Sequence, residues 1–139
     1  MNDKLRTMLI RHEGLRLYPY LDSVGKITIG VGRNLSDNGI TSEECRAMLD
    51  RDISMAVDGV GSLFPDIDTW SPARRDALTD MMFNTGITRF SGFKKMIGAI
   101  KTGAWIAASR EMLDSLWARQ VGDRAIELAK MVETGEYGN

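Results

Sequence analysis

The chain has 139 residues, enough for one domain or for two small lobes that share a core. Hydrophobic residues make up 43% and charged residues 27%, as in ordinary soluble globular proteins, and the formal net charge is −1. Because this balance gives no strongly basic field, we expect no nucleic-acid partner.

The chain holds a single cysteine and a single histidine. One cysteine excludes an internal disulfide, and one residue of each type supplies too few soft ligands for a metal site, so we expect neither a metal nor another cofactor. Cys45 lies at helical spacing from mostly apolar residues, which predicts a buried side chain. The N-terminal residues lack a long apolar run, so we expect no signal peptide and no membrane insertion.

The first predicted element is a helix over about residues 4–12, where apolar side chains follow helical spacing and Asn2 or Asp3 can cap the start. Gly14 is a stop signal. Glu13 is therefore expected at the C-terminal end of this helix.

Residues 16–34 are predicted to form two or three short strands, and Asp22 opens the turn between two of them. Thr28 lies between two isoleucines, and strand alternation points it to the opposite face. Gly30 and Gly32 let a ligand or another backbone approach closely, although a bulge or bend explains them equally well.

Three oxygen-bearing side chains are thus expected close together, Glu13 from a helix end and Asp22 and Thr28 from a hairpin. They supply an acid, a carboxylate and a hydroxyl that can hold water. These are the groups needed to cleave a glycosidic bond with an activated water molecule.

The middle of the chain is predicted to contain one long helix. After a turn at residues 37–39, Thr41 and Glu44 form a capping box, with Thr41 at the cap and Glu44 at the third helical position. The helix is expected to run to about Asp58, and the segment 59–69, with two glycines and a proline, is expected to break it.

The C-terminal part is predicted to be helical throughout. Ser71 followed by Pro72 is a typical helix start, and Gly86 is expected to end that helix. Residues 134–139 are expected to form a frayed tail. Shorter helices are predicted over about residues 92–101, 104–112 and 123–132.

The spacing Glu13-x8-Asp22-x5-Thr28, followed by Ile29-Gly30-x-Gly32, resembles the phage-type lysozymes, the muramidase family of the T-even phage endolysins. Downstream segments extend this resemblance over nearly the whole chain, in order. Residues 74–86, with Phe83-Asn84-Thr85-Gly86 at their end, resemble the family's central helix, and residues 122–127 resemble its Arg-x-x-Glu segment. Ser91-Gly92-Phe93 and Trp117 fall where the family places similar residues. Thr134-Gly135-Glu136-Tyr137, within the tail expected to be frayed, resembles the family's last ordered turn.

The resemblance implies a lysozyme-like α+β fold that is mostly helical, in one domain over residues 1–139. A small N-terminal β-hairpin lobe with its connecting helix, residues 13–58, would be joined to a helical lobe made of residues 59–139 plus 1–12. The substrate cleft is expected between these lobes.

The resemblance also implies hydrolysis of the β-1,4 bond between N-acetylmuramic acid and N-acetylglucosamine in peptidoglycan, with inversion. Glu13 would be the general acid, Asp22 would stay ionised, and Thr28 would help to hold the attacking water. Arg124 matches the family arginine that orients the catalytic glutamate. Asn84 could bind a sugar amide or make a helix-end hydrogen bond. Further residues expected to bind or orient substrate are Gly30, Gly32 and Phe93.

Two positions depart from the family pattern. Arg33 stands where relatives often have a histidine after Gly-x-Gly, and Asp123 replaces an arginine common in relatives. Neither is one of the three core catalytic positions, so the expected activity is unaffected. The departures put sugar contacts at the edge of the cleft in doubt.

Two other functions remain open at this point, a lytic transglycosylase and a catalytically silent peptidoglycan-binding or assembly protein. A transglycosylase needs no water-activating carboxylate, and a silent relative would be expected to lack Glu13 or Asp22. We therefore expect a monomeric phage or prophage endolysin. It would stay in the host cytoplasm until a holin releases it, and would then act on the cell wall in the periplasm.

Overall fold

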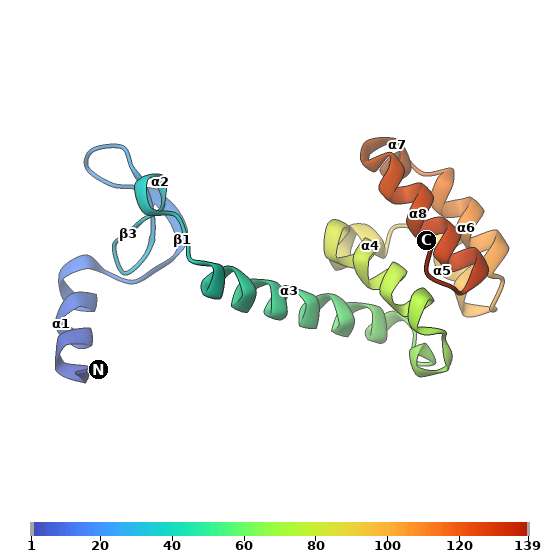
Figure 1. Cartoon of the computed structure of the whole chain (residues 1–139), viewed down its shortest axis with the longest axis horizontal. Helices are drawn as coiled ribbons and strands as arrows, with labels where there is room; N and C mark the ends of the chain where they lie inside the picture. Colours follow the sequence, from blue (N-terminus) through green and yellow to red (C-terminus); the bar gives the residue numbers. More distant parts are fainter. Residues whose placement is uncertain (1, 139) are drawn as a thin grey trace. The chain divides into compact units, whose positions relative to one another are not determined.

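The computed structural model describes residues 2–138 (Figure 1). Met1 and Asn139, which the predicted domain includes, lie outside the described residues. The chain divides into two compact units, residues 1–47 and residues 48–139. Helix α3 (Ser42–Leu63) begins in the first unit and ends in the second.

The first unit combines short helices with a three-stranded antiparallel sheet in the order β1-β2-β3. The strands predicted over residues 16–34 are confirmed. The elements of this unit before α3 are α1 (Asp3–Glu13), β1 (Arg16–Leu21), β2 (Ile27–Gly30), β3 (Arg33–Asn34) and α2 (Leu35–Asn38).

Helix α1 has the ends that its sequence predicts. The Asn2 side chain accepts a hydrogen bond from the backbone N–H of Lys4 at 2.8 Å, which satisfies one of the free N–H groups of the first turn. Gly14, with φ of 80°, ends the helix and donates its N–H to the carbonyl of Ile10. Glu13 is therefore the last helical residue.

Strand β1 contains a bulge. Arg16 faces Gly30 and Tyr20 faces Thr28, so β1 uses four residues where β2 uses two. Pro19 lies within this irregular stretch, where its missing N–H costs no ladder hydrogen bond.

In strand β2 the buried side chain is the threonine and not the isoleucines on either side of it. Thr28 is buried, with 4% of its surface exposed, while Ile27 is exposed and Ile29 is half-buried. Strand alternation does place Thr28 opposite the two isoleucines, as predicted. The threonine can occupy the inner position because its hydroxyl makes a hydrogen bond, described below with the site.

Helix α2 replaces the turn predicted at residues 37–39. Asn34 caps it by accepting the N–H of Asp37 at 3.0 Å, a local hydrogen bond that favours a helical turn over an open one. The Ser36 hydroxyl accepts the N–H of Ile27 at 2.9 Å, and Asp37 forms an ion pair with Lys26 at 3.1 Å. These contacts fasten α2 to the start of β2.

Helix α3 begins as predicted and ends later than predicted. Its capping box is confirmed by two reciprocal hydrogen bonds between Thr41 and Glu44. The helix passes the expected end at Asp58 and continues to Leu63, because Gly59 lies against Met82, where a Cβ would come within 3.2 Å of the sulfur. Close packing against α4 thus outweighs the poor helix propensity of glycine.

The cysteine prediction is wrong. Cys45 is exposed, although its helical spacing predicted burial.

The second unit is a group of helices around one apolar core (Figure 1). Helix α8 packs against α4, α6 and α7, and α5 packs against α6. The largest fully buried side chains include Trp117, Phe64, Phe90, Leu78 and Met81. After α3 the elements are a 3-10 helix (Ile67–Thr69), α4 (Pro72–Phe90), α5 (Lys94–Lys101), α6 (Trp105–Leu113), α7 (Leu116–Val121) and α8 (Asp123–Thr134).

Two predicted boundaries in this unit are informative. Ser71 caps α4 and Pro72 is its first residue, as predicted. Gly86 interrupts α4 with φ of 77° and ψ of 163°, and a further helical turn follows it.

Helix α7, which starts with a Ser115 cap, was not predicted. The mostly helical α+β fold is confirmed.

The tail predicted to be frayed is held as far as Tyr137, and Asn139 lies outside the described residues. The Arg74 guanidinium donates to the carbonyls of Val132 at 2.8 Å and Glu133 at 3.0 Å, which satisfies free carbonyls at the end of α8. The Tyr137 hydroxyl donates to Asp76, and this hydrogen bond raises the pKa of Tyr137 above its ordinary value of 10.0.

Candidate functional site

The Glu13 carboxyl lies against Gly32, at a position where only glycine fits. A Cβ on Gly32 would come within 2.9 Å of Oε2 of Glu13, and the φ of Gly32 is +68°, a conformation that side chains disfavour. The backbone of the β2–β3 turn therefore approaches the carboxyl directly. The observed neighbour of Gly32 is thus a side chain of the same unit, and the substrate-binding role predicted for Gly32 stays a prediction.

A pocket of about 410 Å³ opens beside this carboxyl. Its lining is mostly apolar, with Glu13 and Arg6 as the charged members and Asp22 and Thr28 outside it. The remaining lining residues are Leu9, Ile10, Val31 and Gly32.

Asp22 is fixed at the turn that follows β1. Its Oδ1 accepts the N–H of Val24 at 2.9 Å and the N–H of Lys26 at 2.8 Å, while its own N–H donates to the carbonyl of Lys26 at 2.9 Å. Among the described residues, Oδ2 has no hydrogen-bond partner. One carboxylate oxygen is therefore held by the backbone and the other can bind water or substrate.

Thr28 is fixed by the same residue. Its Oγ1 donates to the carbonyl of Lys26 at 2.9 Å, and its side chain is buried. The Lys26 carbonyl thus accepts from both Asp22 and Thr28. Because the Thr28 hydroxyl proton is used in this bond, the oxygen faces any further partner as an acceptor.

Gly30 ends β2 with φ of +70° and has open space where a side chain would be. Its positive φ accounts for the glycine without a contact. Sequence reasoning placed it with the substrate-binding residues, and that role stays a prediction.

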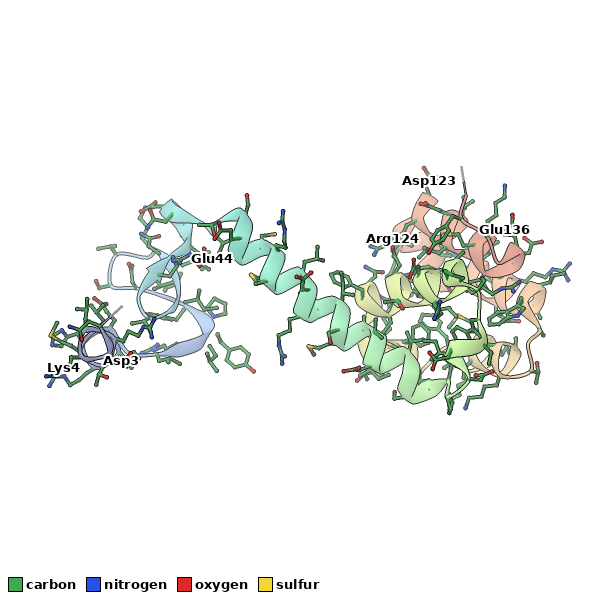
Figure 2. The ribbon with its side chains drawn as sticks, turned by 60° about the horizontal axis from the view of Figure 1, so that its bottom comes forward. Asp3, Lys4, Glu44, Asp123, Arg124 and Glu136 are labelled. Atoms are coloured by element: carbon green, nitrogen blue, oxygen red, sulfur yellow. The ribbon has the colours of Figure 1, made fainter. Side chains whose placement is uncertain are left out.

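Arg124 lies in the second unit, at the start of α8 (Figure 2). Its Nε and Nη2 both contact Oδ1 of Asp80, at 2.8 Å and 2.7 Å. Sequence reasoning did not identify Asp80 as its partner, since the two residues are 44 positions apart. The expected pairing of Arg124 with Glu13 stays a prediction.

The two other predicted substrate contacts also make contacts within the second unit. The Asn84 side chain accepts the indole N–H of Trp117 at 2.7 Å. Phe93 packs edge-to-face against Phe90, with ring centroids 6.4 Å apart. Each residue thus has a contact within the second unit, and the substrate-binding role predicted for each stays a prediction.

Sequence reasoning missed one strong electrostatic feature of the first unit, an ion pair between Arg33 and Glu44. Hydrogen bonds from the Arg33 guanidinium, and then from the Thr41 N–H, hold the pKa of the Glu44 carboxyl at about 2, below its ordinary value of 4.5. The capping box predicted the bond to Thr41. The bond to Arg33 depends on the fold of the strands, and local pattern carries no signal for it.

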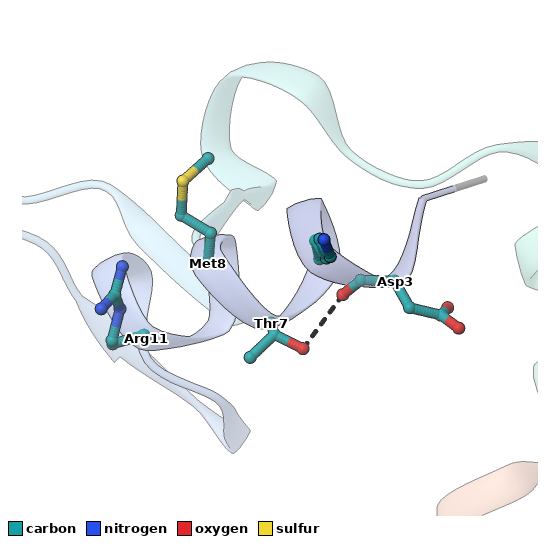
Figure 3. A pocket seen from close by; sticks show the side chains of 5 residues that line it. Asp3, Thr7, Met8 and Arg11 are labelled. Carbon is teal, nitrogen blue, oxygen red and sulfur yellow. Dashed lines mark hydrogen bonds between the residues drawn. The ribbon is translucent and has the colours of Figure 1, made fainter.

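A second hollow lies along one side of α1 and involves this helix alone (Figure 3). Asp3, Lys4, Thr7, Met8 and Arg11 line it. The Thr7 hydroxyl donates to the carbonyl of Asp3 at 3.0 Å, so it is already used within the helix. This surface offers no group arranged for chemistry.

Two further observations apply to residues 2–138 as a whole. In this range no helix has both the length and the apolar character needed to cross a membrane. The same residues contain no group of three or more histidine, cysteine, aspartate or glutamate side chains placed to hold a metal ion.

Comparison with known proteins gives one family and several relatives. The phage lysozyme family model matches residues 10–132. The "Probable T4-type lysozyme 1" of Dictyostelium discoideum is 26% identical, over 97% of this chain and 96% of that protein. The pre-baseplate central spike protein of Enterobacteria phage T4 is 30% identical, over 96% of this chain and 28% of that protein. The SAR-endolysin of Escherichia phage Mu is 29% identical, over 89% of this chain and 76% of that protein.

The family match contains all three residues predicted to be catalytic, together with Arg124. It extends from the end of α1 into α8, and thus spans most of both units. The chain therefore belongs to the phage lysozyme family and is a glycoside hydrolase of the lysozyme type.

Proposed function

We propose that this protein is an endolysin that hydrolyses the β-1,4 bond between N-acetylmuramic acid and N-acetylglucosamine in peptidoglycan, with inversion of configuration. Two hydrogen bonds to the backbone of Lys26 carry the proposal. The Lys26 N–H donates to Oδ1 of Asp22, and the Lys26 carbonyl accepts the hydroxyl proton of Thr28. Family membership supplies the reaction class, and the names of the endolysin relatives support the role.

Glu13 is the proposed general acid. It ends α1, is exposed to solvent, and has its carboxyl against the backbone of Gly32 at the edge of a pocket. A protonated carboxyl there can give its proton to the glycosidic oxygen as the bond to the anomeric carbon breaks.

Asp22 and Thr28 are the proposed water-holding pair. Oδ2 of Asp22 is an open acceptor, and Oγ1 of Thr28 is an acceptor because its proton is donated to Lys26. A water molecule can therefore donate one hydrogen to each of them. Its own lone pair is then free to attack the anomeric carbon.

The proposed reaction balances without another group. As the water oxygen bonds to the anomeric carbon, Asp22 takes up the water proton, and Glu13 gives its proton to the leaving oxygen. Attack from the face opposite to the leaving group converts the β bond into an α-configured reducing end. The two carboxyls then exchange a proton with solvent to restore their starting states.

A lytic transglycosylase is the alternative enzyme. That reaction forms an anhydro ring within the sugar and needs no activated water. The organisation of Asp22 and Thr28 around one backbone residue would have no purpose in it. Finding 1,6-anhydro-muropeptides among the products would support the alternative.

A silent assembly protein is the alternative without activity. The matched T4 relative is named as a pre-baseplate central spike protein, and this chain covers 28% of its length. Loss of the acid or of the water-holding carboxylate would be expected in a silent protein, and Glu13 and Asp22 are both present.

One experiment separates the three candidate functions. Purified protein is added to chloroform-treated Gram-negative cells, and turbidity is followed while the soluble products are examined by NMR. We expect clearing, with the α-anomer released first. No clearing by protein with a native circular dichroism spectrum would favour the silent protein, and anhydro products would favour the lyase.

We further propose that a holin releases the protein from the host cytoplasm to the periplasm. Expression in a Gram-negative host with and without a holin gene tests this route. Lysis of intact cells is expected only with the holin, and equal lysis without it would require another path across the membrane.

A further inference from the structure

Arg33 and Glu44 form a two-pronged ion pair in the first unit. Nη1 of Arg33 lies 2.9 Å from Oε1 of Glu44, and Nη2 lies 2.7 Å from Oε2. Nη1 also donates to the carbonyl of Gly39 at 3.3 Å. Two parallel bonds fix the direction of the guanidinium as well as its distance.

The Glu44 end of this pair is itself anchored. Glu44 lies in the first turn of α3 (Figure 2), accepts the N–H of Thr41 at 2.9 Å, and donates its own N–H to the Thr41 hydroxyl at 3.1 Å. The carboxylate therefore holds Arg33 with one set of contacts and caps the helix with another.

The Arg33 end lies next to the general acid. Arg33 begins β3 and faces Ile29 in the ladder, so its backbone is held by the sheet. The preceding residue is Gly32, whose Cα faces the carboxyl of Glu13 with no room for a side chain. A residue fixed through both its backbone and its side chain also fixes the peptide unit before it.

Apolar packing within the first unit offers little to hold this turn in place. Among residues 2–47, Thr28 is the one buried side chain. Small units without an apolar core depend on other cross-links for a defined structure. The ion pair is such a cross-link, and it joins the strand beside Glu13 to the start of α3.

We infer that the Arg33–Glu44 ion pair is a positioning clamp for the general acid. It holds Gly32 against the Glu13 carboxyl and so fixes the direction from which the proton is delivered. Arg33 and Glu44 touch no reacting atom, and they act through Gly32. The inference rests on the proposed function, because it assigns Glu13 the acid role.

The capping box provides matched variants. Glu44→Gln keeps a side chain that can cap the helix but loses the charge that binds Arg33. Arg33→Gln removes the guanidinium, and Arg33→Lys keeps the charge without the two-pronged geometry. Thr41→Ala weakens the cap and leaves the ion pair in place, so it is the control for helix stability.

The kinetic test uses soluble peptidoglycan fragments of defined length. Arg33→Gln and Glu44→Gln are expected to lower kcat on the order of tenfold to a hundredfold, with KM changed by less than about twofold, because a displaced acid slows the chemical step. The double variant should be no slower than the singles, and Arg33→Lys should fall between. Thr41→Ala should lower Tm and should lower kcat less than either clamp variant, because the Thr41 N–H and the ion pair remain. A kcat at the wild-type level in both clamp variants would overturn the inference.

A spectroscopic test does not depend on activity. Glu13→Gln should shift the amide NMR resonance of Gly32 in the otherwise unchanged protein. In an Arg33→Gln background the same substitution should shift it less, because Gly32 is no longer held at the carboxyl. An equal shift in both backgrounds would refute the clamp. If the Gly32 shift differs between the two backgrounds as expected but the protein does not cleave peptidoglycan, the clamp is supported and the proposed function is refuted.

Discussion

The indole N–H of Trp117 donates a hydrogen bond to the side-chain oxygen of Asn84, 2.7 Å away. Trp117 on α7 is fully buried, and Asn84 lies on α4. The sequence left Asn84 between a sugar contact and a helix-end bond, and the structure provides a third use, a tie between two helices of the core.

Asn84→Ala should therefore act on stability. Removing the acceptor leaves a buried N–H without a partner, which costs about 1–3 kcal/mol. Urea unfolding measures this loss, and Trp117→Phe in a double-mutant cycle isolates the pair from the packing of the indole. If Asn84→Ala instead raises KM and leaves the unfolding curve unchanged, the sugar contact is the correct role.

Local sequence signals located most ends of the helices. The cap at Asn2, the capping box of α3, the Ser71-Pro72 start and the break at Gly86 all depend on contacts within a few residues. Such signals can be interpreted without knowing the fold, because side chain and backbone lie in the same turn.

Features that depend on distant partners could not be predicted in this way. The continuation of α3 past Gly59 depends on Met82, and the ordered tail depends on Arg74. In the site, the spacing of Glu13, Asp22 and Thr28 identified the candidates. The shared Lys26 backbone was not foreseen, since a strand pattern specifies which face a side chain takes and not which carbonyl its hydroxyl binds.

Because of the Arg33–Glu44 ion pair, the stability of the protein should depend on pH in the acid range. The folded-state pKa of Glu44 is about 2 and its ordinary value is 4.5, so the unfolded chain binds the proton more readily. The stabilisation is fully present above pH 4.5 and is lost as the pH falls through about 2. Thermal unfolding across this range should show a fall in Tm that is smaller in Glu44→Gln. The same fall in both proteins would assign the acid sensitivity to other carboxyls.

Arg124 can be tested against its observed partner. If Arg124 also orients Glu13, Arg124→Gln should lower kcat on the order of tenfold or more, while Asp80→Asn should have a smaller effect. Both variants should retain the wild-type unfolding transition within about 1 kcal/mol, since the pair is partly exposed. Equal effects of the two substitutions on kcat would limit Arg124 to its contact with Asp80.

Glu13→Gln should abolish lysis without unfolding the protein. An amide cannot give a proton to the leaving oxygen, and a general acid contributes on the order of 100-fold to 10,000-fold. The matched control is Glu43→Gln. Glu43 is an exposed glutamate in the first turn of α3, and this variant should stay active. A folded Glu13→Gln protein with more than a few per cent of wild-type clearing would remove Glu13 from the acid role.

The water-holding role of Thr28 can be tested by removing or keeping its hydroxyl group. Thr28→Ala removes the acceptor and should lose much of the activity, whereas Thr28→Ser keeps a hydroxyl that can still donate to Lys26 and should keep more.

Thr28→Glu would place a longer carboxylate where the water is proposed to lie, on the side of the sugar opposite to Glu13. That carboxylate could attack the anomeric carbon itself, with Glu13 still protonating the leaving oxygen. The product would be a covalent glycosyl-enzyme, and hydrolysis would stall because the position of the second water is occupied. Intact-protein mass spectrometry should then detect the mass of a bound glycan on Thr28→Glu and none on Thr28→Ala. The wild-type enzyme should release the α-anomer by NMR. Release of the β-anomer would instead make Asp22 a nucleophile, and the water-holding role of Thr28 would be wrong.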